Sequence, residues 1–582
     1  EMFVALPAFF NLFITASSHS AFPGRMTAYY NVLEMMSRSM INTDPAVFSG
    51  HFPNIYSTMA LFLLVPLYWI SRRVPPREKA GKTVLVCILA FSFMFNIPTY
   101  IWHGFHFPNS LPCRYSFIYI FLTLEMGYQA FIYIRRFRVR EIVLCAAAGA
   151  AGVFILEKLY ESDSFTLETA CAGAAFIFLY LIAALWLKNR RRSKTPAIVL
   201  LLVVAIGEIV INTNTTGYST TSRTTYTSDN EAIAQMLAQV QDGSFFRVEK
   251  TKRRTKNDGT WNNYNSASIF SSTTVAGNSD LYGDLGMQGR TNAYSYSGHT
   301  PVTQALLGVR YEIAGEEQSD PLMTEAASSG AYYLYENRYA LSLGYLVYDL
   351  VSSMAIGASV PFDLQNDLLA RACGVDDVFT VMSSYAGERA VFYPEVSGRC
   401  LIYITTDVDK VNVRVTRDAE EIFSRTYDSL ETPEIVDVLD VEAGDEVCVV
   451  SGDEDVSFVT VYPAIMNYER YEEAMTLLAA QQMEITDFED TYVCGTVQVT
   501  DRTTLFTTIP YDPGWSVYVD GEKTEYTDFE DSFILVNLTP GEHVVEFRFW
   551  PPGLTPGIIV SLIALAAFLA VEIVKKCRNL RR

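Results

Sequence analysis

The sequence has few charged residues and few potential metal ligands for its length. Only 19% of its 582 residues are charged and 50% are apolar, whereas soluble proteins average about 25% charged residues. This shortage of charge excludes an ordinary soluble protein and predicts that part of the chain lies in a lipid bilayer. The six histidines and nine cysteines form no CxxC pair and no Cys/His cluster, so zinc and redox sites have no support. The sequence identifies no cofactor and leaves a divalent cation as an open alternative.

Several common motifs are also absent. The chain has no GxGxxG, P-loop, GxSxG or HExxH pattern, so nucleotide cofactors, serine hydrolases and zinc proteases are unsupported. Asp and Glu number 65 against 44 Lys and Arg, which gives a formal net charge of −21. Nucleic-acid binding needs clustered positive charge, so we expect no nucleic-acid partner.

Long apolar runs are abundant. A membrane-spanning helix needs about 20 mostly apolar residues. Seven runs come close to this length: 54–70, 83–100, 116–134, 141–157, 168–187, 196–212 and 556–574. Residues 3–13 are typical of the outer end of an eighth helix. We therefore expect the chain to be the C-terminal part of a longer membrane protein.

The orientation of these spans is predicted by Lys and Arg, because short basic loops stay in the cytoplasm. Four hydrophilic stretches are basic, at 72–82, 135–140, 188–194 and 575–582, and the loops between them carry few basic residues. Residues 213–554 hold 21 Lys and Arg but 53 Asp and Glu, a net charge of −32. This alternation predicts a multi-pass protein of a bacterial plasma membrane with a large acidic extracellular region.

The chain divides into four predicted regions. Residues 1–212 are a transmembrane helical bundle with one truncated helix and six spans, and 555–582 are a C-terminal transmembrane helix with a basic cytoplasmic tail. Residues 213–379 mix helix and strand patterns. From 380 to 554, period-2 alternation and turns such as DPG and TPGE predict a β-sandwich region. Within it, Cys400 and Cys448 lie in strand-like runs and are either two buried thiols, which we favour, or a disulfide.

Two stretches resemble the YfhO family of bacterial membrane proteins. One is IWHGFHFPNSLPCRYSF (101–117). The other runs from IPYDPGWSVYVDGEKTEY (509–526) to FILVNLTPGEHVVEFRFWPPG (533–553). Between them FFRVE (245–249), LLGVRY (306–311) and YENRYALSLGY (335–345) are similar to family patterns. The resemblance implies a GT-C-type glycosyltransferase with a GT-C-like helical bundle, here partial, and a catalytic acid in an outward loop upstream of residue 1. On that expectation, the chain alone would be inactive.

The predicted outward loop 101–115 holds the first candidate binding residues. Arg114 could neutralise a departing phosphate bidentately, or it could be an interfacial anchor whose charge reaches the lipid head groups. His103 could bind phosphate or acceptor, or cap and pack a helix. Trp102 could stack on a sugar, although tryptophan is common at membrane interfaces. Asn109 and His106 lie in the same loop.

Glu125 and Glu208 are further candidates, because an ionisable group within a membrane span is costly unless it faces a partner or a cavity. Each either contributes to substrate binding or is neutralised by a structural partner. For Glu125, we expect that partner on a helix upstream of residue 1.

Together these observations favour a membrane glycosyltransferase. The resemblance implies that it moves a sugar from undecaprenyl phosphate to a cell-wall polymer such as lipoteichoic acid, on the outer face of the membrane. The expected partners are the lipid bilayer, the polyprenyl-phosphate-linked sugar and the wall polymer. A flippase or transporter of lipid-linked sugars, and a non-catalytic wall-binding protein, are the alternatives.

Overall fold

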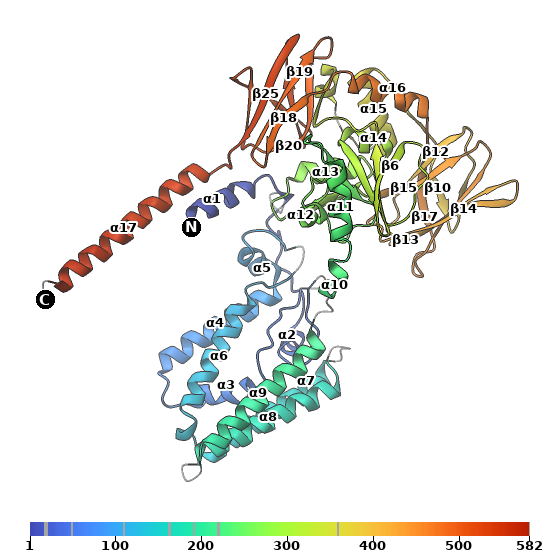
Figure 1. Ribbon diagram of the computed structural model, residues 1–582. Coiled ribbons are helices and arrows are strands. Elements are labelled where there is room, and N and C mark those ends of the chain that lie inside the picture. The colour runs from blue at the N-terminus through green and yellow to red at the C-terminus, as the bar shows by residue number, and fades with distance from the viewer. Residues whose placement is uncertain are drawn as a thin grey trace. The chain divides into compact units, whose positions relative to one another are not determined.

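The computed structural model consists of two compact units (Figure 1). A helical unit comprises residues 20–221, and a β-rich unit comprises residues 1–19 and 222–582. The structure describes residues 1–16, 21–47, 51–108, 111–160, 165–189, 193–217, 221–354, 356–357 and 360–580. Asn109 and parts of two predicted basic stretches, 190–192 and 581–582, lie outside the described residues.

The helical unit is built from apolar helices that bury one side against their neighbours. Its helices are α2 (Val32–Ser37), α3 (Leu61–Ile70), α4 (Pro76–Met94), α5 (Asn96–Trp102), α6 (Ser116–Ile132), α7 (Val139–Leu159), α8 (Leu167–Lys188) and α9 (Thr195–Thr216), with a 3-10 turn at Ile134–Arg136. In the described part of the chain, α7, α8, α9 and α17 (Leu554–Leu580) are long and apolar enough to cross a membrane. The expected combination of membrane-type helices with a large β-rich region is confirmed, but in the described part of the chain four helices are both long and apolar enough to span a membrane, instead of seven.

Two predicted spans are interrupted, each for a physical reason. The run 54–70 becomes helical only at Leu61, because the backbone and side chains just before it bind a buried carboxylate, as described below. The run 83–100 breaks at Phe95, which is extended with φ −122° and ψ 141°. Pro98 causes this break, since it has no N–H and its ring would clash with the carbonyl of residue 94 in a continuous helix.

The β-rich unit begins with a four-stranded sheet in the order β1-β5-β7-β6. Its strands are β1 (Arg247–Lys250), β5 (Val309–Ala314), β6 (Met323–Ser329) and β7 (Tyr332–Asn337); β1 and β5 are parallel and the other pairs are antiparallel. Helix α11 (Asn230–Val240) packs on one face through a buried apolar cluster that includes Ile233 and Met236. A smaller sheet of β2 (Ile269–Phe270), β4 (Ala293–Ser295) and β3 (Gln288–Arg290) lies in the same region of the chain.

Residues 379–466 form the first β-sandwich. One sheet has the order β10-β17-β12-β15 with β9 paired to β17, and the other has the order β11-β16-β13-β14. The strands are β9 (Phe379–Val381), β10 (Tyr385–Gly387), β11 (Ala390–Phe392), β12 (Gly398–Ile404), β13 (Lys410–Arg417), β14 (Glu420–Asp428), β15 (Glu434–Val441), β16 (Glu446–Ser451) and β17 (Val459–Met466). Alternate residues such as Ile402, Val413 and Val449 fill the core between the sheets, as their period-2 pattern predicts.

The second β-sandwich follows helix α16 (Tyr468–Ala479). Its sheets have the orders β18-β19-β25-β21-β22 and β23-β24-β20-β8. The strands are β8 (Gly344–Val347), β18 (Glu484–Glu489), β19 (Tyr492–Val499), β20 (Thr504–Pro510), β21 (Trp515–Val519), β22 (Glu522–Thr524), β23 (Thr527–Phe529), β24 (Phe533–Asn537) and β25 (Gly541–Phe549). Strand β8 belongs to the predicted 213–379 region yet pairs with β20, so this sheet joins segments on both sides of residue 380.

Short helices complete the β-rich unit and share a buried core with the sandwiches. They are α10 (Arg223–Tyr226), α12 (Asp258–Asn262), α13 (Ala276–Asp284), α14 (Pro301–Leu306), α15 (Pro361–Cys373) and a 3-10 helix at Asp349–Ser353. Phe362 on α15, Tyr471 on α16 and Phe506 on β20 all lie in this core. All nine cysteines are free, so Cys400 and Cys448 are two buried thiols.

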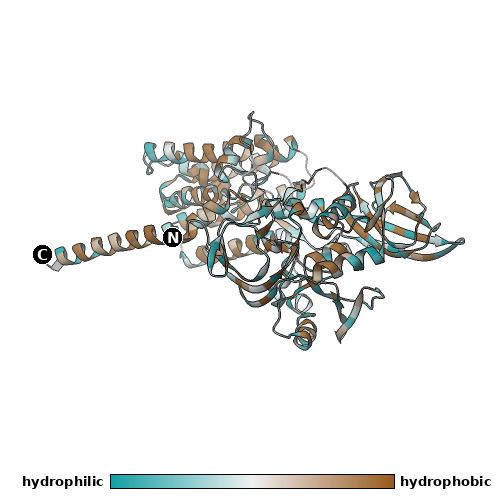
Figure 2. Cartoon of the chain, turned by 90° about the horizontal axis from the view of Figure 1, so that it is seen from above, coloured by the Kyte–Doolittle hydropathy of each residue, from teal (hydrophilic) through white to brown (hydrophobic). Residues whose placement is uncertain are grey.

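The first and last helices of the chain pack against each other. Helix α1 (Met2–Asn11) contacts α17, which is apolar along most of its length (Figure 2). A Cβ placed on Gly557 would lie 2.5 Å from the carbonyl oxygen of Met2 and 2.8 Å from Cα of Phe3. The missing side chain at Gly557 therefore lets the two backbones approach closely, as small residues do in membrane helix pairs.

This contact predicts that Gly557→Leu separates α1 from α17. We expect the free energy of unfolding in detergent to fall by about 1–3 kcal/mol, because the neighbouring atoms are backbone and cannot yield. Gly152→Leu on α7 is the matched control, since nothing lies within 4 Å of a Cβ at that position. Thermal unfolding of both variants checks the prediction, and equal melting temperatures would contradict it.

Candidate functional site

Glu208 on α9 is buried inside the helical unit, with 2% of the residue exposed. Its carboxylate accepts four hydrogen bonds. The donors are the hydroxyls of Tyr56 (2.6 Å), Thr58 (2.8 Å) and Tyr180 (2.5 Å), and the backbone N–H of Met59 (2.5 Å). Two donors bind each oxygen, so the hydrogen-bonding capacity of the carboxylate is used.

These four donors come from two other parts of the unit. Tyr180 lies in the middle of α8, and the other three donors lie in the non-helical segment that leads into α3. Thr58 also accepts a hydrogen bond from the backbone N–H of Ala60 at the start of α3 (3.2 Å). Glu208 therefore fixes α8, α9 and the entry to α3 relative to one another.

An apolar groove of about 410 Å³ lies next to this carboxylate. Tyr180 contributes to both, since its ring lines the groove and its hydroxyl binds Glu208. The other lining residues are apolar and come from α3, α6, α8, α9 and the residue before α3: Ala60, Leu63, Leu64, Phe131, Ala184, Ile198, Leu201, Leu202 and Ala205. The volume falls in the range of ligand pockets, and the lining suits a hydrocarbon chain.

The loop after α5 brings together three of the predicted binding residues. His103 is 8% exposed; its Nδ1 lies 2.8 Å from the carbonyl oxygen of Thr99, and its Nε2 accepts a hydrogen bond from the backbone N–H of Arg114 (3.4 Å). Burial lowers the pKa of His103, so its imidazole is neutral at physiological pH. His103 therefore links the backbone of Arg114 to the end of α5.

Aromatic rings surround this part of the loop. The indole of Trp102 stacks on Tyr115 at 5.2 Å and donates to the hydroxyl of Ser92 (3.1 Å), while 46% of the residue stays exposed. His103 meets the edge of Tyr115 at 5.6 Å. Trp102, His103 and Arg114 therefore form one cluster, which we call the loop cluster.

Glu125 belongs to a different arrangement. On α6, its carboxylate pairs with Lys82 of α4 at 2.8 Å, and Lys82 also pairs with Glu78 at 2.8 Å. The side chain of Gln129 donates to Glu78 at 2.8 Å. The expectation that the partner of Glu125 lies upstream of residue 1 is wrong, because α4 begins at Pro76 and carries Lys82 into contact with α6.

Sequence reasoning missed Tyr56, Thr58 and Tyr180 as partners of Glu208. A hydroxyl in the middle of the apolar run FIFLYLIAALW was the available signal for Tyr180. Within the described ranges, no group of three or more His, Cys, Asp or Glu is arranged to hold a metal ion. Binding of a divalent cation therefore stays an open alternative.

The hydrogen bonds of Glu208 predict that Glu208→Gln destabilises the protein. An amide offers one acceptor oxygen and turns a nitrogen toward hydroxyl donors, so we expect a loss of about 2–4 kcal/mol in the free energy of unfolding. Glu125→Gln is the control. We expect it to lower the free energy of unfolding by less than about 1 kcal/mol, because Lys82 still pairs with Glu78 and the Glu125 side chain is 39% exposed. Thermal unfolding in detergent distinguishes the two, and equal losses would contradict this account of Glu208.

Comparison with known proteins gives distant structural matches and a family. No curated protein sequence matches the chain. A Paenibacillus sp. cycloisomaltooligosaccharide glucanotransferase is 8% identical over 27% of this chain and 40% of its own, with a TM-score of 0.11. A cupin 2 conserved barrel domain protein from Leptotrichia buccalis is 9% identical over 30% and 89%, with a TM-score of 0.11. The arabinofuranosyltransferase AftD from Mycobacteria is 11% identical over 84% of this chain and 66% of its own, with a TM-score of 0.18.

These structural likenesses are too weak to support a function. The chain spans less than half of the length of the glucanotransferase. The family comparison is far more extensive. The profile of the family described as bacterial membrane protein YfhO matches residues 1–420 and 402–561. Together the two matches include the helical unit, both sandwiches and the start of α17. The chain belongs to the YfhO family of bacterial membrane proteins.

Proposed function

We propose that the protein is a membrane glycosyltransferase that moves a sugar from undecaprenyl phosphate to a cell-wall polymer, lipoteichoic acid for example. The observation that carries this proposal is the loop cluster at the ends of α5 and α6. It groups Arg114, whose backbone N–H binds the neutral imidazole of His103 and whose charge acts on that imidazole, with the exposed indole of Trp102. The charge of Arg114 can meet the phosphate, and the indole of Trp102 can meet the ring face of a lipid-linked sugar.

Each group has a chemical role in the proposed reaction. Negative charge develops on the phosphate as the sugar leaves, and Arg114 would stabilise it with charge-assisted hydrogen bonds. His103 would hold the loop in place through Thr99 and the Arg114 backbone. Trp102 would stack on the sugar. The apolar groove beside Tyr180 offers the helical unit a surface for the polyprenyl chain.

The proposed orientation follows the basic residues. Basic stretches at 72–82, 135–140, 188–194 and 575–582 would face the cytoplasm. The β-rich unit and the loop cluster would then face outward, where the wall polymer is. Glu208 would act as a positioning residue, because its oxygens are occupied by protein donors.

Arg114→Ala tests the proposal. Transfer of labelled sugar from a polyprenyl-phosphate donor into wall polymer should fall at least about 100-fold, in membranes that carry the full gene product. Arg114→Lys should recover part of the activity, since it restores the charge without the bidentate geometry. Lys158→Ala is the control, because the Lys158 side chain is 77% exposed and lies at the end of a different helix.

Folding and insertion of each variant are checked by gel filtration and thermal unfolding. Unchanged transfer in a folded Arg114→Ala variant would contradict the proposal. If the wild type translocates the donor in vesicles without acceptor and transfers no label, the flippase alternative replaces it.

A further inference from the structure

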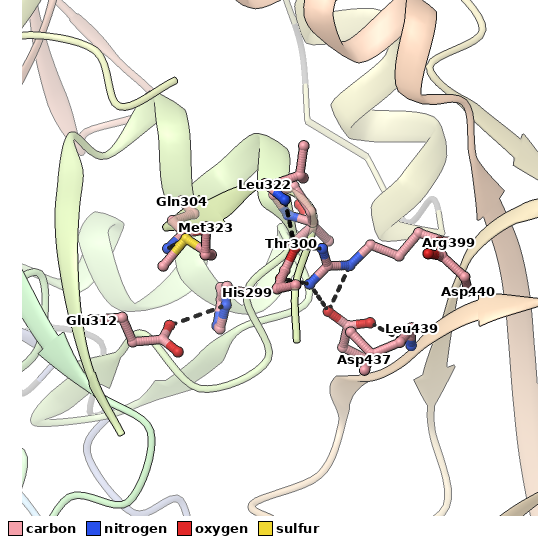
Figure 3. Close-up of polar contacts among 12 residues, drawn as sticks. His299, Thr300, Gln304, Glu312, Leu322, Met323, Arg399, Asp437, Leu439 and Asp440 are labelled. Carbon is pink, nitrogen blue, oxygen red and sulfur yellow. Dashed lines mark hydrogen bonds and ion pairs between the residues drawn. The ribbon is translucent and has the colours of Figure 1, made fainter. Parts of the chain in front are cut away.

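Buried charges of the β-rich unit find partners inside it, as the group around Arg399 shows (Figure 3). The guanidinium of Arg399 on β12 donates to Asp437 at 2.9 Å and pairs with Asp320 at 2.8 Å. In the same view His299 lies beside Glu312, at 3.8 Å. These contacts use the charges of the group, so it calls for no outside partner. An apolar strand near the end of α1 differs, because it is open to its surroundings.

This open strand is β2, at the edge of the sheet β2-β4-β3. Both of its residues are apolar and exposed, Ile269 by 37% and Phe270 by 56%. Successive strand residues point to opposite faces, so both faces of β2 are open in the described structure. An exposed apolar edge strand favours association with another surface. The position of β2 indicates which surface that is.

The segment that follows β2 is joined to the end of α1. The side chain of Asn11 donates to the carbonyl oxygen of Thr273 at 3.3 Å, and the backbone N–H of Ala276 donates to the carbonyl oxygen of Ile14 at 3.0 Å. Residues 15 and 275 form an isolated antiparallel bridge. Phe270 therefore lies three residues from a backbone that is hydrogen-bonded to the end of α1.

Helix α17 gives the depth of this junction in the bilayer. The basic end of the helix begins at Lys575, and a span needs about 20 mostly apolar residues. Counting back from Lys575 places the other edge of the hydrocarbon core near Thr555. Trp550 is 57% exposed and its indole donates to the hydroxyl of Thr555 at 3.0 Å. Tryptophan is common at this level of a membrane, which agrees with the count.

Helix α1 ends at the same level. A Cβ on Gly553 would lie 2.5 Å from Cδ2 of Phe10, whereas one on Gly557 would lie 2.5 Å from the carbonyl oxygen of Met2. The two helices are therefore antiparallel, and the last residues of α1 lie beside the start of α17. Residues 11–15, and the segment 271–276 that binds them, consequently lie where the hydrocarbon core gives way to lipid head groups.

A cation projects from the same side of the small sheet as Phe270. The register places Phe270 beside Ala293, and Ala293 beside Arg290; paired residues share a face. The side chain of Arg290 is 62% exposed and pairs with Glu431 at 2.9 Å, while Lys256 pairs with the same carboxylate at 2.6 Å. Two cations on one carboxylate leave a positive charge, which suits the phosphate of a lipid head group.

We infer that β2 and the residues after α1 form a lipid-contact patch, which enters the head-group region of the bilayer. The patch consists of Leu12, Phe13, Ile269 and Phe270, with Arg290 at its polar edge; Leu12 and Phe13 are 43% and 63% exposed. Contact with lipid removes these side chains from water, as it does for interfacial segments. The patch holds the β-rich unit on the bilayer through a contact that no spanning helix makes. The inference does not rest on the proposed transfer reaction.

Photolabelling in liposomes tests the inference. The full chain is reconstituted in equal parts of phosphatidylglycerol and phosphatidylethanolamine with a phospholipid that carries a diazirine near its head group, and mass spectrometry locates the adducts. We expect at least about ten-fold more adducts on Ile269 and Phe270 than on Phe458, which is 59% exposed in the first sandwich, because burying an apolar side chain strongly favours lipid contact. Adducts confined to the helices, or β2 cross-linked to a second copy of the chain in place of lipid, would overturn the inference.

The variant Phe270→Asp locates the contact. Labelling of Ile269 should fall at least about ten-fold, since a carboxylate resists entry into the apolar part of the interface, and labelling of α17 should not change. Phe458→Asp is the matched control, because it makes the same change at another exposed position; it should leave the labelling of Ile269 unchanged. Thermal unfolding confirms that both variants are folded. Unchanged labelling of Ile269 in a folded Phe270→Asp variant would overturn the assignment, and no sugar donor or acceptor is present to affect the result.

Discussion

The helical unit depends on one buried carboxylate and its four donors. Glu208 lies within a helix that is apolar enough to cross a membrane, where an unpaired charge would cost several kcal/mol. The hydroxyls and the N–H that bind it come from α8 and from the segment before α3. Because this segment donates hydrogen bonds to Glu208, it does not form a further N-terminal turn of α3. The same contacts place the ring of Tyr180 along the apolar groove.

The two units offer different chemistry. In the helical unit, the loop cluster presents a guanidinium and an exposed indole, and the groove presents hydrocarbon side chains. In the β-rich unit, a cavity of about 500 Å³ is lined by residues that include Glu317, Asp320, Glu325 and Asp440. A phosphate suits the first arrangement and is repelled by the carboxylates of the second.

Much of this could be predicted from local patterns, and the rest depends on contacts between distant segments. Period-2 alternation located the sandwich strands, and apolar length located α7, α8, α9 and α17. The sequence did not show that β8 joins β20, because strand pairing across more than 150 residues has no local signal. Glu125 and Glu208 were found from their position in apolar runs. Their partners Lys82 and Tyr180 follow only from the packing of helices.

Binding of the lipid phosphate is the most direct test of the central claim. Native mass spectrometry of the full gene product would compare decaprenyl phosphate with decaprenol, which has the same chain and no phosphate. The account predicts at least about ten-fold tighter binding of the phosphate, since Arg114 supplies a charge-assisted contact that the alcohol lacks. Equal affinity for the two lipids would mean that the loop cluster recognises no phosphate, and it would contradict the proposed function.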